Sequence, residues 1–246
     1  PRGPSAIGGK ASLAFLDGAI DAARTGLVDA IVTAPISKTS WHQAGMKKYP
    51  GHTELLAARF GAKHVAMMFV APQLRVVLAT IHEPVSELRN LFTIGRVFDP
   101  MELADRALRN WFGCEKPRLA VCGLNPHAGE EGRFGDEERR VITPAILMAE
   151  QAGIQADGPF PADTVFTKAL AGEYDCVVAM YHDQGLIPIK LLARDEAVNL
   201  TLGLPIIRTS PDHGTAFDIA GRGTAHPGSM IAAINLAIDL ANQGRA

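Results

Sequence analysis

Residues 176–185 read Cys176-Val-Val-Ala-Met-Tyr-His-Asp-Gln-Gly185, a short apolar run followed at once by a histidine. Such a run, rich in valine, is typical of a buried strand. Two other segments share this design. Arg75-Val-Val-Leu-Ala-Thr-Ile leads into His82, and Leu119-Ala-Val-Cys-Gly-Leu-Asn-Pro leads into His127. The sequence therefore predicts three buried strands that each carry a histidine just after the carboxyl end.

On either side of these segments, apolar β-branched runs alternate with helical patterns. The predicted strands are Ala30–Ala34, Ala66–Val70, Arg75–Thr80, Leu119–Gly123, Cys176–Met180 and Pro205–Arg208. The predicted helices are Ala11–Thr25, Thr53–Phe60, Met101–Phe112, Glu137–Gln151 and Ser229–Asn242. This alternation indicates an α/β fold, in which helices flank a largely parallel sheet. The short gap between Val70 and Arg75 predicts one hairpin, so the sheet is mixed. The pattern does not place the boundary of a second lobe.

Composition excludes several classes of protein. Among 246 residues, 47% are hydrophobic and 20% are charged, enough to bury a full core. The formal net charge of −2 provides no basic field for nucleic acid, and no apolar run is long enough to span a bilayer. Cys114, Cys122 and Cys176 lack Cys-x-x-Cys spacing, which predicts buried thiols in a reducing cytoplasm. Because the chain opens at Pro1 without Met, we expect further residues upstream.

The three histidines suggest a metal site. In open α/β sheets, ligands bind outside the carboxyl ends of the strands, so His82, His127 and His182 are expected to meet there. Three neutral imidazoles with an open position are typical of a catalytic metal ion. The alternative is that each histidine caps a loop. For one histidine alone this alternative is favoured, but the shared placement of all three favours the metal.

Two further features predict an anion site. Gly51-His52-Thr53-Glu54 stands at a predicted helix start, with Thr53 as the cap, where free N–H groups suit a phosphate or carboxylate. An ordinary cap with an incidental His52 is equally consistent with the pattern. Arg208 ends an apolar strand, so it needs an anion or an internal salt bridge with nearby Asp212 or Asp218.

Other polar segments leave their roles open. Lys190 and Asn199 lie in a stretch with few charges, and Asp163 follows a proline turn as a helix cap or a catalytic carboxylate. The acidic segment Glu130–Glu138 is interpreted as a solvated turn and helix start. Small residues in Pro211–Gly221 would let backbone approach a flat ligand. No Gly-x-Gly-x-x-Gly follows a strand, so a Rossmann cofactor site is not supported.

Five strings of the chain resemble signatures of the 4-hydroxythreonine-4-phosphate dehydrogenase family. They occur in family order between about Thr33 and Gly228: Gly51-His-Thr-Glu, Leu124-Asn-Pro-His-Ala-Gly-Glu, Pro161-Ala-Asp-Thr, Tyr181-His-Asp-Gln-Gly and Arg208-Thr-Ser-Pro-Asp-His-Gly-Thr-Ala. The segment from His213 to Gly221 also resembles the NAD loop of isopropylmalate dehydrogenases, which share the wider fold. The resemblance implies an isopropylmalate dehydrogenase-like fold with two lobes around a cleft.

Site residues follow from the resemblance position by position. It implies a divalent metal (Zn, Mg or Co) on His82, His127 and His182, in a homodimer whose metal site combines the first two with the third from the partner subunit. Substrate contacts are expected from His52, Thr53, Lys190, Asn199 and Arg208. NAD or NADP is expected at His213, Gly214, Thr215 and Asp218, and the base is expected to be Lys190 or Asp163.

The implied reaction is oxidation of the secondary alcohol of 4-hydroxythreonine 4-phosphate. The resulting 3-oxo acid loses carbon dioxide to give 3-amino-2-oxopropyl phosphate, in vitamin B6 biosynthesis. Residues 1–246 are then one dehydrogenase unit that lacks the family's N-terminal strand and loop. One alternative is a dehydrogenase of a four-carbon sugar-acid phosphate such as threonate 4-phosphate. Another is a metal-dependent phosphohydrolase, which leaves the His213–Gly221 loop without a role.

Overall fold

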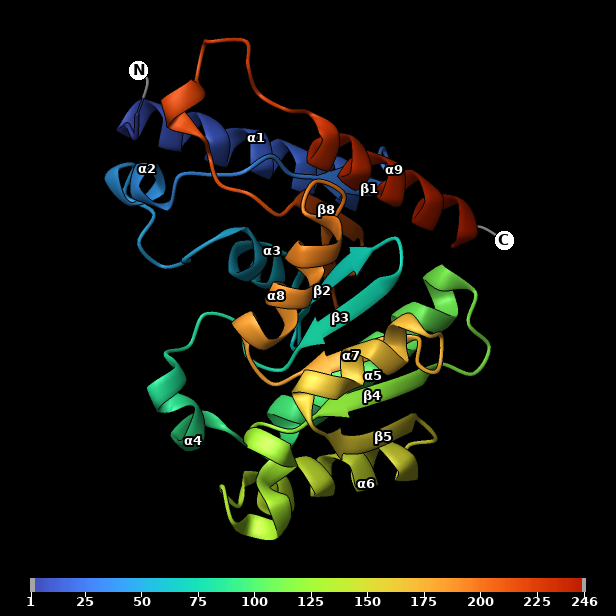
Figure 1. Ribbon diagram of the computed structural model, residues 1–246. Helices are drawn as coiled ribbons and strands as arrows, with labels where there is room; N and C mark the ends of the chain where they lie inside the picture. The colour runs from blue at the N-terminus through green and yellow to red at the C-terminus, as the bar shows by residue number, and fades with distance from the viewer. Residues whose placement is uncertain (1–2, 245–246) are drawn as a thin grey trace. The chain divides into compact units, whose positions relative to one another are not determined.

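The computed structural model describes residues 3–244, which form two compact units (Figure 1). One unit comprises the chain up to Val65 together with Val198–Asn242. The other is built mainly from Ala66–Ala197. The division agrees with the expectation of two lobes, and it supplies the boundary that the sequence pattern did not place.

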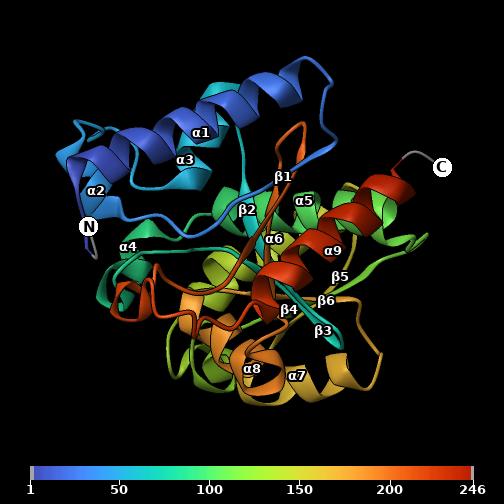
Figure 2. The ribbon, with the colours of Figure 1, turned by 90° about the horizontal axis from the view of Figure 1, so that it is seen from above.

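The first unit contains three strands: β1 (Ala30–Val32), β7 (Val198–Leu202) and β8 (Ile207–Pro211). Strand β8 pairs parallel with β1 and antiparallel with β7, so Arg208 has Ile31 on one side and Thr201 on the other. The helices are α1 (Ala6–Arg24), α2 (Lys38–Gln43), α3 (His52–Phe60) and α9 (Gly228–Gln243). Helices α1 and α9 lie on opposite sides of β1 (Figure 2).

The core of the first unit sits where α1, α2, α3 and β1 meet. Its buried side chains are Leu16, Ile20, Ile31, Trp41, Leu55, Leu56 and Leu204. Helix α1 begins where the Ser5 side chain accepts a hydrogen bond from the Gly8 amide, which satisfies one of the free donors of the first turn. This apolar packing holds the start of α3 against the sheet.

The second unit contains β2 (Ala66–Ala71), β3 (Leu74–Leu78), β4 (Arg118–Cys122), β5 (Gln155–Phe160) and β6 (Cys176–Ala179). They are arranged in the order β2-β3-β6-β4-β5. Strands β2 and β3 form the predicted antiparallel hairpin, and the other neighbouring pairs are parallel. The mixed, largely parallel sheet is therefore confirmed, and the carboxyl ends of β3, β6 and β4 lie next to one another.

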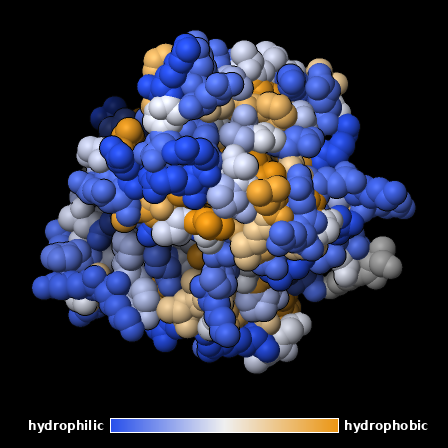
Figure 3. All heavy atoms as spheres, turned by 90° about the horizontal axis from the view of Figure 1, so that it is seen from below, coloured by the Kyte–Doolittle hydropathy of each residue, from blue (hydrophilic) through white to orange (hydrophobic). Residues whose placement is uncertain are grey.

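Helices cover both faces of the strands in this unit. They are α4 (Leu88–Leu91), α5 (Ile94–Phe112), α6 (Thr143–Gln151), α7 (Ala162–Leu170) and α8 (His182–Ala193). Helices α5 and α6 lie on one face, and α7 and α8 lie on the other (Figures 1 and 2). Some hydrophobic side chains stay exposed, such as Leu147 and Met148 on α6, and the view from below shows hydrophobic residues scattered among hydrophilic ones (Figure 3). Within residues 3–244, no helix has the length and apolar character needed to cross a membrane.

Several elements differ from their predicted form. The pattern missed α2, α4, α7, α8, β5 and β7, and it placed Thr53 at the cap of α3, whereas Gly51 occupies that position. In α8, Gly185 and Pro188 weaken the helical signal. A side chain at Gly185 would bring its Cβ within 2.7 Å of Leu78 Cδ2, so the glycine allows close packing on β3. Packing thus overrides weak local propensity.

Candidate functional site

Arg208 forms the centre of a polar cluster in the first unit. It is 3% exposed on β8, and its guanidinium donates hydrogen bonds to Thr201 Oγ1 at 3.0 Å and Thr33 Oγ1 at 2.6 Å. These partners are neutral hydroxyls, and the Nε atom is buried without a hydrogen-bond partner among residues 3–244. Burial lowers the pKa of Arg208 to about 10, while Glu54 acts to raise it. The group stays charged at neutral pH.

His52 lies beside this guanidinium at the first position of α3. Arg208 Nη2 lies 3.4 Å from His52 Nδ1, and Trp41 contacts the imidazole edge to face with ring centroids 5.4 Å apart. Burial, and then the charge of Arg208, lower the pKa of His52 to about 3. A neutral ring that accepts at Nδ1 carries its proton on Nε2, which is then a donor for an anion. The cluster therefore combines the positive charge of Arg208 with a neutral N–H donor on His52.

The other substrate residues predicted in this unit occupy nearby positions in the fold. Thr53 is 4% exposed in the first turn of α3, next to His52. Asn199 lies on β7 two residues before Thr201, and therefore on the same face of the strand as the hydroxyl that contacts Arg208. Lys190, by contrast, belongs to the second unit, in the last turn of α8, where its side chain is exposed.

The predicted cofactor loop leaves β8 on the surface of the first unit. His213, Gly214 and Asp218 are exposed, and Thr215 is half-buried. The imidazole Nδ1 of His213 lies 2.9 Å from the carbonyl oxygen of Gly214, and Asp218 falls in a short 3-10 turn, Phe217–Ile219. The loop therefore offers exposed backbone and small side chains directly after the strand that carries Arg208.

In the second unit, the ends of β3 and β6 bring two of the predicted histidines together. The Ala79 amide donates to the Ala179 carbonyl oxygen at 2.8 Å, and Thr80 Oγ1 donates to the Met180 carbonyl oxygen at 2.7 Å. These bonds extend the parallel pairing past the strand ends. As a result, the His82 and His182 rings lie with centroids 5.9 Å apart and planes tilted by 34°.

A glutamine ties the β6 end to the β4 end. Gln184 Oε1 accepts from the Met180 amide at 2.6 Å, and its Nε2 donates to the Gly123 carbonyl oxygen at 2.8 Å. The side chain thereby links the strand that leads to His182 with the strand that leads to His127. Sequence reasoning assigned Gln184 no role, although it stands in the same short motif as His182.

His127 projects from a segment with unusual backbone geometry, Pro126–Gly132. Its side chain is 68% exposed, and Nδ1 lies 3.4 Å from Glu130 Oε2. Across residues 3–244, no three or more His, Cys, Asp or Glu side chains are grouped so as to hold a metal ion. The structure therefore brings His82 and His182 together within one chain, and it does not complete a three-ligand set with His127.

The sequence interpretation placed the whole acidic segment Glu130–Glu138 in solvent, and the structure corrects this for its last two residues. Glu137 and Glu138 are 5% and 6% exposed. Glu138 shares the spacing of the buried positions Val141, Ile142, Ala145, Ile146 and Ala149, so its place on the apolar side of the helix was a signal in the sequence. The carboxylates of Glu137 and Glu138 both accept hydrogen bonds from Asn125 Nδ2, at 2.8 and 3.0 Å.

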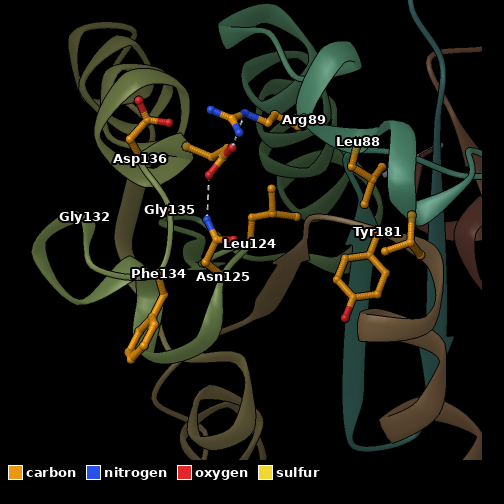
Figure 4. Close-up of a pocket in the computed structure, with 11 residues that line it drawn as sticks. Leu88, Arg89, Leu124, Asn125, Gly132, Phe134, Gly135, Asp136 and Tyr181 are labelled. Atoms are coloured by element: carbon orange, nitrogen blue, oxygen red, sulfur yellow. Dashed lines mark hydrogen bonds and ion pairs between the residues drawn. The ribbon is translucent and has the colours of Figure 1, made fainter.

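A pocket of about 560 Å³ opens beside these acids (Figure 4). Asn125, Phe134, Gly135 and Tyr181 contribute to its lining, and Arg89 is linked to Glu137 at 3.5 Å. The lining includes Tyr181, which precedes His182, and Asn125, two residues before His127, but it includes none of the three predicted metal ligands. The other candidate base, Asp163, is exposed in the first turn of α7, where Pro161 and not Asp163 is the cap.

Comparison with known proteins identifies the family. Residues 2–237 match the family model of the pyridoxal phosphate biosynthetic protein PdxA. The 4-hydroxythreonine-4-phosphate dehydrogenase of Erythrobacter litoralis is 51% identical over 239 residues, covering 96% of this chain and 71% of that protein. The enzyme of that name from Geobacter metallireducens is 55% identical over 88% of this chain and 63% of its own length. A Klebsiella pneumoniae crystal structure of that enzyme matches with a TM-score of 0.91 and 46% identity, over 98% of this chain and 72% of its own.

Proposed function

Because the chain belongs to the PdxA family of 4-hydroxythreonine-4-phosphate dehydrogenases, we propose that it oxidises the secondary alcohol of 4-hydroxythreonine 4-phosphate with NAD or NADP. It is an oxidoreductase of pyridoxal phosphate biosynthesis. Bound NAD or NADP would accept hydride from the alcohol carbon, and a base of the protein would take up the hydroxyl proton. The 3-oxo acid formed then loses carbon dioxide and leaves 3-amino-2-oxopropyl phosphate.

The observation that carries this proposal is the buried, positively charged Arg208 with neutral partners. A guanidinium that is almost fully desolvated recognises a phosphate or carboxylate strongly, because water no longer screens the charge. His52 adds the N–H donor at Nε2, and Thr53 and Asn199 are the further contacts that we assign to the substrate. The family resemblance also assigns Lys190 to substrate binding.

A divalent metal ion, Zn, Mg or Co, is assigned to His82, His127 and His182. The fit is supported by three imidazoles that offer nitrogen donors of the type these ions accept, exposed at His82 and His127 and half-buried at His182. When bound, the ion would act as a Lewis acid that stabilises negative charge on the substrate oxygen. The Asp183 carboxylate, 2.7 Å from His182 Nδ1, orients that ring so that Nε2 is the free nitrogen.

The remaining roles concern the cofactor and the base. The exposed loop with His213, Gly214, Thr215 and Asp218 is assigned to NAD or NADP, which is supported by its small residues and its exit from β8. Lys190 or Asp163 is assigned as the base. Two subunits are proposed to share the metal site. The buried free thiols of Cys122 and Cys176 support a cytoplasmic location.

One experiment separates this function from its two alternatives. Purified protein is mixed with 4-hydroxythreonine 4-phosphate, a divalent metal salt and NAD or NADP, and absorbance of the reduced nicotinamide is followed. Appearance of that band is expected. A faster reaction with threonate 4-phosphate would favour the sugar-acid enzyme. Release of inorganic phosphate without nicotinamide reduction would establish a phosphohydrolase and overturn the proposal.

A further inference from the structure

The segment that presents His127 adopts a left-handed turn. Five consecutive residues have positive φ: His127 (51°), Ala128 (52°), Gly129 (81°), Glu130 (42°) and Glu131 (57°). Only glycine adopts this conformation without a steric penalty, and four of the five residues are not glycine. Such a run persists only where the surrounding structure holds it in place.

The group that holds the turn is the carboxylate of Glu138. Glu138 Oε1 accepts hydrogen bonds from the backbone amides of Leu124 at 2.8 Å and Asn125 at 2.7 Å. Its Oε2 accepts from Asn125 Nδ2 at 3.0 Å. The side chain is buried, so these three bonds replace its contacts with water. One carboxylate therefore fixes the backbone between the end of β4 and the residue before Pro126.

The turn itself packs against the same carboxylate. A Cβ atom at Gly129 would lie 2.6 Å from Glu138 Oε2, and one at Gly123 would lie 3.1 Å from Oε1. The Ala128 amide donates to the Asn125 carbonyl oxygen at 3.1 Å, which joins the turn to the residue that Glu138 anchors. Glu138 thus touches both the start and the middle of the segment around His127.

His127 itself is aimed outward by this arrangement. Its Nδ1 faces Glu130 Oε2, a neighbour within the turn, and its ring also packs edge to face against Phe134. That leaves Nε2 as the ring nitrogen free to meet a ligand. The direction of Nε2 depends on the left-handed conformation, because both contacts come from residues beside or within the turn.

We propose that Glu138 is a positioning residue for His127: its buried carboxylate holds the left-handed turn that directs the imidazole toward the metal site. This inference rests on the proposed function, since it takes His127 as a metal ligand. It extends that function to a residue that contacts neither substrate nor metal. A purely structural acid would stabilise the unit without affecting the affinity of the site.

The test measures Co²⁺ binding by titration in the absence of substrate and NAD, using the wild type, Glu138→Ala, Glu138→Gln and His127→Ala. Outer-shell partners of metal ligands typically contribute about ten- to a hundredfold in metal affinity, and a loss of that size is expected for Glu138→Ala. Glu138→Gln keeps an oxygen for the two backbone amides but sets its own amide against that of Asn125. Its Co²⁺ affinity should therefore fall between those of the wild type and Glu138→Ala.

A matched control comes from another buried acid of the same unit. Asp105 is 9% exposed and pairs with Arg109 at 2.8 Å on α5, so Asp105→Asn also removes a buried charged contact. It should lower the melting temperature without changing Co²⁺ affinity. Hydrogen exchange adds a readout that needs no metal. The backbone amides of Leu124 and Asn125 should exchange faster in both Glu138 variants than in the wild type. Their exchange rates in Asp105→Asn should equal those of the wild type.

The outcomes separate two failures. If wild type and His127→Ala bind Co²⁺ equally, His127 is no ligand and the proposed metal site fails. If His127→Ala weakens binding and Glu138→Ala does not, the positioning role is wrong while the metal site stands. Should Glu138→Ala fail to fold, Glu138→Gln decides alone, because wild-type affinity and wild-type exchange in that variant would overturn the inference.

Discussion

Arg208 carries a positive charge in a nearly dry environment, and its partners Thr33 and Thr201 are uncharged. Transfer of a charge out of water is costly unless a partner compensates for it. Arg208 lies on β8, next to the exposed loop that follows this strand. At the scale of single residues, the uncompensated charge of Arg208 is the feature that supports the proposed anion site.

Arg208→Ala should lower kcat/KM by roughly two orders of magnitude or more, because a desolvated, charge-assisted contact contributes about 2–5 kcal/mol. Nicotinamide cofactor affinity should change little. Arg59→Ala is the matched control, since Arg59 forms an exposed ion pair with Asp17 in the same unit. Steady-state kinetics measure both variants. Unaltered kinetics in Arg208→Ala would remove this side chain from the substrate site.

His52 should make the fold sensitive to mild acid. Its pKa is about 3 in the folded protein and 6.5 ordinarily, so the unfolded chain binds more protons between these values. The contribution of neutral His52 to the free energy of unfolding is fully present above pH 6.5 and is lost as the pH falls toward 3. The slope from this group is at most about 1.4 kcal/mol per pH unit.

Urea unfolding at pH 7, 6 and 5 checks this dependence. His52→Asn should flatten the fall in unfolding free energy over that range, where most carboxylates are still ionised. His64→Asn serves as the comparison, because His64 is exposed in the same unit, and this variant should keep the slope of the wild type. Equal slopes in wild type and His52→Asn would mean that His52 is not held neutral.

At the scale of elements, α8 depends on one glycine for its distance from the sheet. A Cβ at Gly185 would lie 2.7 Å from Leu78 Cδ2 and 2.9 Å from Val76 Cγ1. Gly185→Ala should therefore destabilise the protein by about 1–3 kcal/mol through overpacking. It should also weaken activity, because His182 is the first residue of the same helix.

Gly18→Ala is the control for Gly185→Ala. It makes the same glycine-to-alanine change in a helix, with the same effect on backbone entropy, but without the steric overlap. Gly18 is an exposed position of α1, and a Cβ there meets nothing within 4 Å. Alanine should raise the free energy of unfolding by roughly 0.5–1 kcal/mol, since glycine is the poorer helix former. Thermal melts of both variants give the comparison. If Gly185→Ala raised the free energy of unfolding, a methyl group would fit between α8 and β3, and the overpacking argument would be wrong.

At the scale of the whole molecule, one chain brings His82 and His182 together but does not complete a three-ligand set among its described residues. The resemblance implies that His182 comes from the partner subunit. A His82→Ala dimer and a His182→Ala dimer should each be inactive. In a hybrid dimer of the two variants, one metal site carries both substitutions and the other metal site carries neither.

Random mixing makes half of the dimers hybrid, so about a quarter of wild-type activity should return if the twofold dimer shares its sites. Native mass spectrometry confirms that hybrids form. No rescue in confirmed hybrids would assign His82 and His182 to the same chain, as their proximity in one chain also allows. Mixing His127→Ala with His182→Ala then tests whether His127 is the ligand that crosses between subunits.

The sequence by itself determined the α/β class, the β2–β3 hairpin and the placement of three histidines after strand ends, because these depend on local periodicity. Family membership likewise followed from short strings. Only the tertiary structure revealed the contact between His52 and Arg208, the hydrogen bonds that Glu138 accepts and the left-handed turn at His127. These features depend on contacts between segments distant in the chain. A carboxylate becomes buried, or a turn left-handed, only when the segments that surround it have folded together.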